Sequence, residues 1–443
     1  MSVSKTMNTA VTGLRAQQDA IGIVGDNIAN SNTVGFKQSR ALFEDILGNF
    51  SGARTVGAGG GAKMIRAQQI FSQGALKTTG VPSDLALSGD GFFVWSGAVD
   101  GFDGQYYSRD GSFFVNAEGT LVNSLGLKLQ GYSEANGASF GGPIGDISVQ
   151  PLTLPPKETS TVELVANLDS SATTFAAAGG ANDFDPADPS NTSNFSTSVT
   201  VFDSQGNPHS LDVYFVRLND GAVPPNATND WEVHVLDGNT ELTDGSPATP
   251  PKVSFDTAGK LISADAVTLT NVNWDPANPS PLTTNNLITF KVGNPTGAGG
   301  SGLDGLTQYG SVSSVSKQSQ DGYTAASLTG LDVTADGTVN GIYSNSQKLA
   351  LAQVAVAKFA SNDGLSRSGH NLFSETLDSG QANLGAASSG GRGGIVSGAV
   401  EQSNVDLAAQ FVDMIGFQRA FSANSKTITT ADELLVETLN LKR

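Results

Sequence analysis

The three histidines are the residues of this 443-residue chain best suited to acid–base chemistry or zinc binding. They are His209, in the turn-like segment NPHS, His234, in an expected strand, and His370, and they are far apart in the sequence. The chain has no cysteine, which excludes disulfides and thiol chemistry and leaves a zinc site dependent on these scattered histidines. We therefore expect ordinary surface or strand roles for them, and neither a catalytic triad nor a metal site.

Three further patterns bear on chemistry. The segment GAGGGAK at 57–63 lacks the order of glycine, lysine and hydroxyl residue that defines a phosphate-binding loop. The segment DPADP at 185–189 lacks the regular oxygen-ligand spacing of a calcium loop, so a turn is expected. Carboxylates are numerous enough to leave a glycosidase-type pair open, although acidic loops produce such pairs by chance. We predict a protein that is not an enzyme and needs no cofactor.

Charge and hydropathy narrow the possible partners. The net charge is -18 and no basic cluster exceeds two residues, so nucleic acid is not an expected partner. Residues 151–305 hold 18 Asp and Glu against 5 Lys and Arg, which predicts a solvent-facing segment. The N-terminus has no apolar signal region and the chain has no run of 18 apolar residues, so we expect neither a cleaved signal peptide nor membrane insertion.

The elements that would position any site begin and end with helices. Apolar residues recur in two heptad rows over residues 1–30, and Asn30 to Asn32 followed by Gly35 provide a stop. Two similar rows cover 405–443, where Ser403 or Asn404 is the expected N-cap. Neither helix can bury its stripe alone, so the two ends of the chain should pair. Polar residues interrupt the rows at Gln17, Gln418, Ser425 and Asp432, where they would weaken the seam but set its register.

The residues predicted to form this helix and polymer interface are Val3, Met7, Ala10, Leu14, Ile21, Val24, Ile28, Leu407, Phe411, Val412, Met414, Ile415, Phe421, Ile428, Leu435 and Leu439.

Between the helices the pattern is one of short strands and glycine turns. The loops NAEGT, DTAGK and TADGT each place glycine late in a hairpin, which indicates antiparallel sheet. The predicted fold class is α+β, mainly β: a nested multidomain chain whose N- and C-terminal helices pair as a coiled coil, with two outer antiparallel β-domains. The predicted segments are a helix at 1–30, a connecting region at 31–70 with a short helical turn in SRALFEDIL, a β-body at 71–155 and 306–380, an inserted β-domain at 156–305, a second connecting region at 381–404 and a helix at 405–443.

Several of these segments resemble the axial protein family of the bacterial flagellum, which builds its rod and hook. NIANSNTVGFK is similar to that family's N-terminal signature, and SNVDLAAQFVDMIGFQRAFSANSKTITTADELL is similar to its terminal helix almost position by position. LSGDGFF, YSRDGSFFVNAEGTLVNSLGLKLQGY and GTVNGIYSN add likeness in the β-body. VTVFDSQGNPHSLDVYFV resembles the outer domain of hook members, which favours a hook subunit and leaves a distal rod subunit as the near alternative.

The resemblance implies a subunit of a curved, flexible tube that carries motor torque to the filament, located outside the cell in the flagellar hook. It implies export through the flagellar type III apparatus, with Phe43 and Leu47 as an export motif. It also implies contacts with further copies of the chain and with rod, hook-cap, hook-length-control and hook-filament junction proteins. The alternative from another class is a secreted carbohydrate-active enzyme or adhesin that carries its acidic β-domain on a helical stalk.

Overall fold

The computed structural model of the chain describes residues 2–46, 59–133, 142–150, 153–176, 184–219, 229–242, 250–264, 267–269 and 287–440. Its contacts define two compact units, one made of Met1–Leu152 with Leu328–Arg443 and the other of Thr153–Ser327. Two long helices accompany a chain dominated by strands, which confirms the predicted class, α+β and mainly β. None of the helices in the described ranges is long and apolar enough to cross a membrane.

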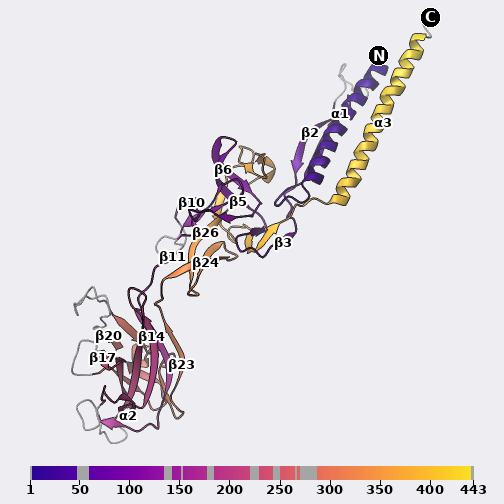
Figure 1. Cartoon of the computed structure of the whole chain (residues 1–443). Helices are drawn as coiled ribbons and strands as arrows, with labels where there is room; N and C mark the ends of the chain where they lie inside the picture. The colour runs from indigo at the N-terminus through magenta and orange to yellow at the C-terminus, as the bar shows by residue number, and fades with distance from the viewer. Residues whose placement is uncertain are drawn as a thin grey trace. The chain divides into compact units, whose positions relative to one another are not determined.

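The helices α1 (Ser2–Ala29) and α3 (Leu407–Asn440) lie side by side and run antiparallel, so that the two chain ends lie together (Figure 1). Asn27 hydrogen-bonds Gln410 near one end of the pair. Fourteen residues away on each helix, the α-carbon of Gly13 faces the side chain of Asn424. These two contacts are separated by two heptads, which is the spacing of a coiled-coil seam. The predicted pairing of the chain ends is confirmed.

A β-hairpin covers another face of α1. Its strands are β1 (Ser39–Asp45) and β2 (Ala62–Gln69), and both contact α1. A side chain at Gly61 would collide with Thr12 of the helix, since a Cβ there would lie 1.9 Å from the threonine Oγ1. The prediction of a helical turn in SRALFEDIL is therefore wrong: an extended segment can pair with β2 and lie against the helix, whereas an isolated helical turn has little to stabilise it.

The β-body of the first unit is an antiparallel sheet with shorter strands at its edges. The main order is β24-β25-β26-β9-β5-β6-β28-β27, and β7, β8, β10 and β29 pair alongside. The bounds are β5 (Phe92–Val99), β6 (Phe102–Ser108), β7 (Phe114–Val115), β8 (Leu121–Val122), β9 (Lys128–Ser133), β10 (Ile144–Asp146), β24 (Ala326–Val333), β25 (Thr338–Tyr343), β26 (Lys348–Lys358), β27 (Ser366–Arg367), β28 (Phe373–Ser374) and β29 (Asn383–Ala386), followed by the pairs β3 (Leu76–Thr78) with β31 (Ala399–Glu401) and β4 (Leu85–Ser88) with β30 (Gly394–Ser397).

Strand β5 separates two apolar clusters. Phe93 and Trp95 point to one cluster, and Phe92 and Val94 point to the other, as the twofold periodicity of a strand requires. All four side chains are at most 1% exposed. The continuous apolar run GFFVW is therefore typical of a strand that is buried on both faces.

The second unit packs two sheets around one core. The first sheet contains β12 (Thr161–Asp169), β20 (Val267–Leu269), β21 (Ile288–Lys291), β22 (Thr307–Tyr309) and β23 (Ser314–Gln320). The second contains β13 (Phe175–Ala176), β14 (Phe195–Phe202), β15 (Pro208–Asn219), β16 (Asn229–Asp237), β17 (Thr240–Leu242), β18 (Lys252–Phe255) and β19 (Leu261–Ala264). Leucine and valine of β12 share a core cluster with Phe215 and Trp231 of the other sheet, so the unit is a β-sandwich.

Two details of this unit differ from the predicted map. Strand β12 pairs in parallel with β21 and β22, and β13 pairs in parallel with β15, although most pairs are antiparallel as predicted. The unit also extends to Ser327, beyond the predicted limit at 305, because β22 and β23 both pair with β12. The three glycine hairpin loops are found as predicted, with positive φ angles at Gly119, Gly259 and Gly337.

Candidate assembly interface

Small side chains dominate the buried residues of the helix pair. The alanines Ala10, Ala16 and Ala20 on α1 and Ala431 on α3 are at most 4% exposed. At Gly13 a Cβ would stand 2.8 Å from the amide nitrogen of Asn424. Small residues allow the two helix axes to approach closely, and this leaves the larger apolar side chains to lie elsewhere on the pair.

The structure places the predicted interface residues in three environments. On α1, Ala10 and Val24 are buried, and Val3, Met7, Leu14, Ile21 and Ile28 are half-buried. On α3, Met414 and Ile428 are half-buried, whereas the side chains that face solvent are Leu407, Phe411, Val412, Ile415, Phe421 and Leu435. The side chain of Leu439 lies outside the described residues, as does Leu47 of the predicted export motif.

The row of α3 that meets the first helix and its hairpin is Gln410, Phe417, Asn424 and Ala431, which is one residue away from the predicted row Phe411, Gln418, Ser425 and Asp432. Phe417 packs edge-to-face on Phe43 of β1, with ring centroids 6.2 Å apart. One residue corresponds to about 100° of rotation around a helix. The hydrogen bond of Gln410 to Asn27 and the close approach of Asn424 to Gly13 accompany this rotation, and the apolar heptads alone did not reveal it.

Many large apolar side chains of α3 consequently stay exposed within the described part of the chain. These side chains are exposed by 37–69%; they are Leu407, Phe411, Val412, Ile415, Phe421, Leu434, Leu435 and Val436. Burying one such side chain fully stabilises a complex by about 1.5–3 kcal/mol. Exposed apolar side chains gathered along one helix in this way mark a surface for protein association.

A polar network ties the helix pair to the hairpin. The Asn27 amide donates to the carbonyl of Ser39 at 2.7 Å and to Gln410 Oε1 at 2.9 Å, and it accepts from the Ser39 amide at 2.9 Å. Asn27 is fully buried, so each of these hydrogen bonds replaces one that water would otherwise make. The same side chain therefore holds both neighbours of α1 in register.

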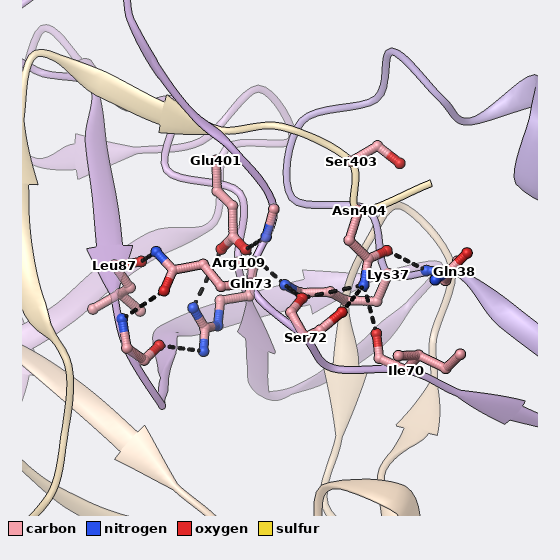
Figure 2. Close-up of polar contacts among 12 residues, drawn as sticks. Lys37, Gln38, Ile70, Ser72, Gln73, Leu87, Arg109, Glu401, Ser403 and Asn404 are labelled. Atoms are coloured by element: carbon pink, nitrogen blue, oxygen red, sulfur yellow. Dashed lines mark hydrogen bonds and ion pairs between the residues drawn. The ribbon is translucent and has the colours of Figure 1, made fainter. Parts of the chain in front are cut away.

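A buried ion cluster joins the chain ends to the β-body (Figure 2). The carboxylate of Glu401, in β31, accepts from Lys37 Nζ at 2.7 Å, from the Gly74 amide at 2.7 Å and from Arg109 Nη1 at 3.2 Å. The three charged side chains are no more than 4% exposed. Burial lowers the pKa of Lys37 and that of Arg109, and the attraction of Glu401 offsets part of each shift. The cluster connects the segment after α1, the segment before α3 and the loop after β6.

Asn404 completes this junction (Figure 2). Its amide donates to the Ile70 carbonyl at 2.7 Å and to the Ser72 carbonyl at 3.1 Å, and its Oδ1 accepts from the Gln38 amide at 2.8 Å. The expected N-cap role of Asn404 or Ser403 is therefore wrong, because Asp406 Oδ1 accepts from the first free amides of α3. Asn404 instead holds together the two segments that enter and leave the helix pair.

The glycine of the segment NTVGFK has a specific structural role. Gly35 has φ +69°, and a Cβ there would lie 2.5 Å from the backbone nitrogen of Asp110. Its amide donates to the Glu401 carbonyl at 2.8 Å. A residue without a side chain is therefore needed for the chain to leave α1 and reach the β-body.

Lys37, Arg109, Glu401 and Gln410 are functional candidates that the sequence patterns missed. Their charge gives no periodic signal, and exposed lysines and glutamates are far more common than buried ones. Lys37, Arg109 and Gln410 lay inside segments already noted for their resemblance to axial proteins, NTVGFK, SRDGSFF and SNVDLAAQF, but nothing in those segments indicated their contacts. The partnership of Lys37 and Arg109 with Glu401 spans almost the whole chain and needed the fold to be seen.

Four family models match this architecture. The Flagella basal body rod protein model matches residues 7–37, and the Flagellar basal body rod FlgEFG protein C-terminal model matches 396–441. The Flagellar hook protein FlgE/F/G D1 domain model matches 86–167, and the Flagellar basal body protein FlaE D2 domain model matches 167–323. The helix pair, β-body and sandwich thus define an axial structural protein of the bacterial flagellum.

Whole-chain relatives specify the family further. The chain is 34% identical to the flagellar hook protein FlgE of Escherichia coli, over 98% of this chain and 99% of that protein. It is 30% identical to the flagellar hook protein FlgE of Treponema pallidum, over 99% and 100%. The crystal structure of Helicobacter pylori flagellar hook protein FlgE2 shares the fold, with a TM-score of 0.50, 15% identity, and coverage of 72% of this chain and 98% of that one. The chain belongs to the flagellar hook protein family, whose members are structural subunits of the hook.

Proposed function

We propose that this chain polymerises through its terminal helices into the curved, flexible tube of the hook, and that the tube transmits motor torque to the filament. The observation that carries the proposal is the exposed apolar face of α3, where Phe411, Val412 and Ile415 are exposed by 49–69%. About half or more of the surface of each of these residues is left uncovered in its own subunit. Neighbouring subunits of a tube would bury them on every copy.

The rest of the subunit supports a mechanical role. The buried cluster of Lys37, Arg109 and Glu401 joins three segments of the first unit, so load applied at the helices passes into the β-body through hydrogen-bonded contacts. The protein performs no catalysis in this role. Its further partners are the rod, hook-cap, hook-length-control and hook-filament junction proteins.

Location and export follow from the same proposal. The chain leaves the cell through the flagellar type III apparatus and resides in the extracellular hook. Phe43 and Leu47 form the export motif. In the folded subunit Phe43 packs on Phe417, so this residue of the motif is fully accessible only before folding. The whole-chain similarity to flagellar hook proteins and the match of the D2 domain model to 167–323 favour a hook subunit over a distal rod subunit.

The test removes the outer face of α3 while leaving the helix pair intact. The double variant Phe411→Ser with Ile415→Ser should fold as the parent does and should form no tubes when concentrated and viewed by negative-stain microscopy. Ile262→Ser, at a position of the second unit that is 38% exposed, is the matched control and should form normal tubes. Normal tubes from the double variant would show that this face is not the polymerising surface.

A further inference from the structure

A buried histidine lies on the outer face of the second sheet of the β-sandwich. His234, in β16, is 5% exposed, and because side chains alternate along a strand it points away from the core that Val233 beside it enters. Phe184 covers the imidazole, with the two ring centroids 4.1 Å apart and the ring planes inclined by 20°. Phe184 is also buried and shares a small apolar cluster with Val216 and Leu236, so it closes this face of the sheet.

A carboxylate lies at each ring nitrogen of His234. Nδ1 lies 2.5 Å from Oε1 of Glu241 in β17, and Nε2 lies 3.8 Å from Oε2 of Glu232 in the same strand. A neutral imidazole has one N–H, whereas an imidazolium has two. If the single N–H of the neutral ring pointed to Glu241, the lone pair of Nε2 would face the carboxylate of Glu232. The geometry therefore favours the protonated ring.

The charges around His234 balance when the ring is protonated. Lys252 of β18 lies 3.5 Å from Oε1 of Glu232, so this carboxylate has a cationic partner of its own. Glu241 and the imidazolium form the second ion pair. Loss of the proton would leave this largely buried group with one uncompensated negative charge, which is costly where little water can screen it.

The other titratable groups on this face add no positive charge. Tyr214 of β15 stands directly opposite His234, and burial and the nearby Asp212 raise its pKa above 10.0, so the phenol stays neutral while a histidine titrates. Asp230 lies on the same face of β16, and Asp185 follows Phe184 in the covering segment. These carboxylates increase the need for a cation at His234.

The direction of the pH dependence follows from these contacts. Burial opposes the charge of His234, but the carboxylates of Glu232 and Glu241 raise its pKa above the ordinary 6.5. A group whose pKa is raised by folding stabilises the folded state fully below its unfolded value, and the stabilisation is lost as the pH rises through the folded value. The contacts of His234 should therefore weaken in alkaline medium.

We propose that His234, Glu232 and Glu241 form a pH-sensitive clasp on the second unit. With His234 protonated, the clasp holds β17 against β16 through Glu241. It also holds Phe184 over the sheet, since a cation is attracted to the face of an aromatic ring. With His234 neutral, the clasp loosens and Phe184 uncovers the apolar surface beneath it. All of these groups belong to one unit of one chain, so the clasp does not depend on polymerisation.

The first test is an NMR titration of the histidine side chains in the full-length protein. The chain has three histidines, and the signal that disappears in His234→Gln identifies the one in the clasp. His234 should titrate above 6.5. A measured pKa at or below 6.5 would overturn the clasp.

Hydrogen exchange followed by mass spectrometry tests what the clasp holds. Exchange is measured at about pH 5.5 and about pH 9, and each rate is divided by that of an unstructured peptide of the same sequence at the same pH. Protection of β17 and of the residues that follow Phe184 should fall by about tenfold for each unit by which the measured pKa of His234 exceeds 6.5. Strands β12 and β23 of the other sheet are the internal reference and should keep their protection.

Substitutions separate the clasp from a general effect of pH. His234→Gln removes the charge, so the protection of β17 should no longer depend on pH. His209→Gln is the matched control, because it makes the same change at another histidine of the same unit and should keep the parent's response. Glu241→Gln leaves the histidine in place and should lower its pKa and reduce the response, which keeps the test decisive if His234→Gln fails to fold.

Three results would overturn the proposal. They are equal protection of β17 at the two pH values in the parent, an unchanged response in Glu241→Gln, and a response that His209→Gln abolishes as fully as His234→Gln does.

Discussion

Replacing Glu401 by glutamine tests whether the buried ion cluster holds the first unit together. The substitution keeps the shape of the side chain and removes its charge. Lys37 and Arg109 would then remain buried, 1% and 4% exposed, with no counter-charge within hydrogen-bond distance in the described structure. The side-chain amide of glutamine would also bring an N–H donor close to the N–H groups that now donate to the carboxylate, so one donor would lose its acceptor.

The expected loss of unfolding free energy for Glu401→Gln can be judged against that of a second substitution. Removing one partner of a buried ion pair typically costs about 3–5 kcal/mol, because the other charge is left uncompensated. Glu401→Gln should therefore cost at least that much. Lys37→Met leaves Glu401 paired with Arg109 and removes the buried ammonium group. Burial already lowers the pKa of Lys37, which shows that its charge is disfavoured there. The cost of this substitution should stay below about 2 kcal/mol.

The measurement must resolve one unit of a two-unit chain, for which a single unfolding transition is not assured. Hydrogen exchange followed by mass spectrometry reads the opening free energy of β4 and β31 separately from the second unit. Asp332→Asn is the control, since it breaks an exposed pair with Lys348 at 3.2 Å and should cost about 0–1 kcal/mol. Equal effects of Glu401→Gln and Asp332→Asn, or a larger effect of Lys37→Met, would refute the reasoning.

Three further predictions use other parts of the chain. Gly35→Ala should cost more than about 3 kcal/mol in thermal unfolding, whereas Gly80→Ala, with φ +74° but open space around it, should cost only about 1 kcal/mol. Burial opposes the charge of Asp321, but hydrogen bonds from neighbouring hydroxyl and amide groups lower its pKa to about 2 from 3.8. The stability it contributes to the second unit is thus complete above pH 3.8 and is lost as the pH falls through about 2, and Asp321→Asn should remove that acid-dependent loss from an unfolding series. Phe43→Ala with Leu47→Ala should lower secretion into the medium but leave purified protein able to form tubes; unchanged secretion would remove the export motif.

Local patterns were sufficient for most elements. Heptad spacing located both long helices within three residues of their observed bounds, and glycine late in a polar loop marked hairpins at Gly119, Gly259 and Gly337. These signals are local because a helix or a tight hairpin is specified by residues that are close in sequence. The hairpin on α1 was missed because it depends on residues that are distant in sequence. Phe43 is extended because Phe417, far along the chain, covers one side of it.

The sequence by itself determined the pairing of the chain ends, the mainly β body and the membership of the axial protein family. Each of these follows from periodicity or from local resemblance, which need no knowledge of distant contacts. Tertiary structure alone decided which face of α3 meets α1 and which of its apolar side chains stay exposed. The hydrogen bond of Gln410 to Asn27 accompanies that rotation, and the same fold brings Lys37, Arg109 and Glu401 into one buried cluster. Polar side chains fix such orientations through single, directional hydrogen bonds. The spacing of residues along a chain does not specify the direction of such a contact in space.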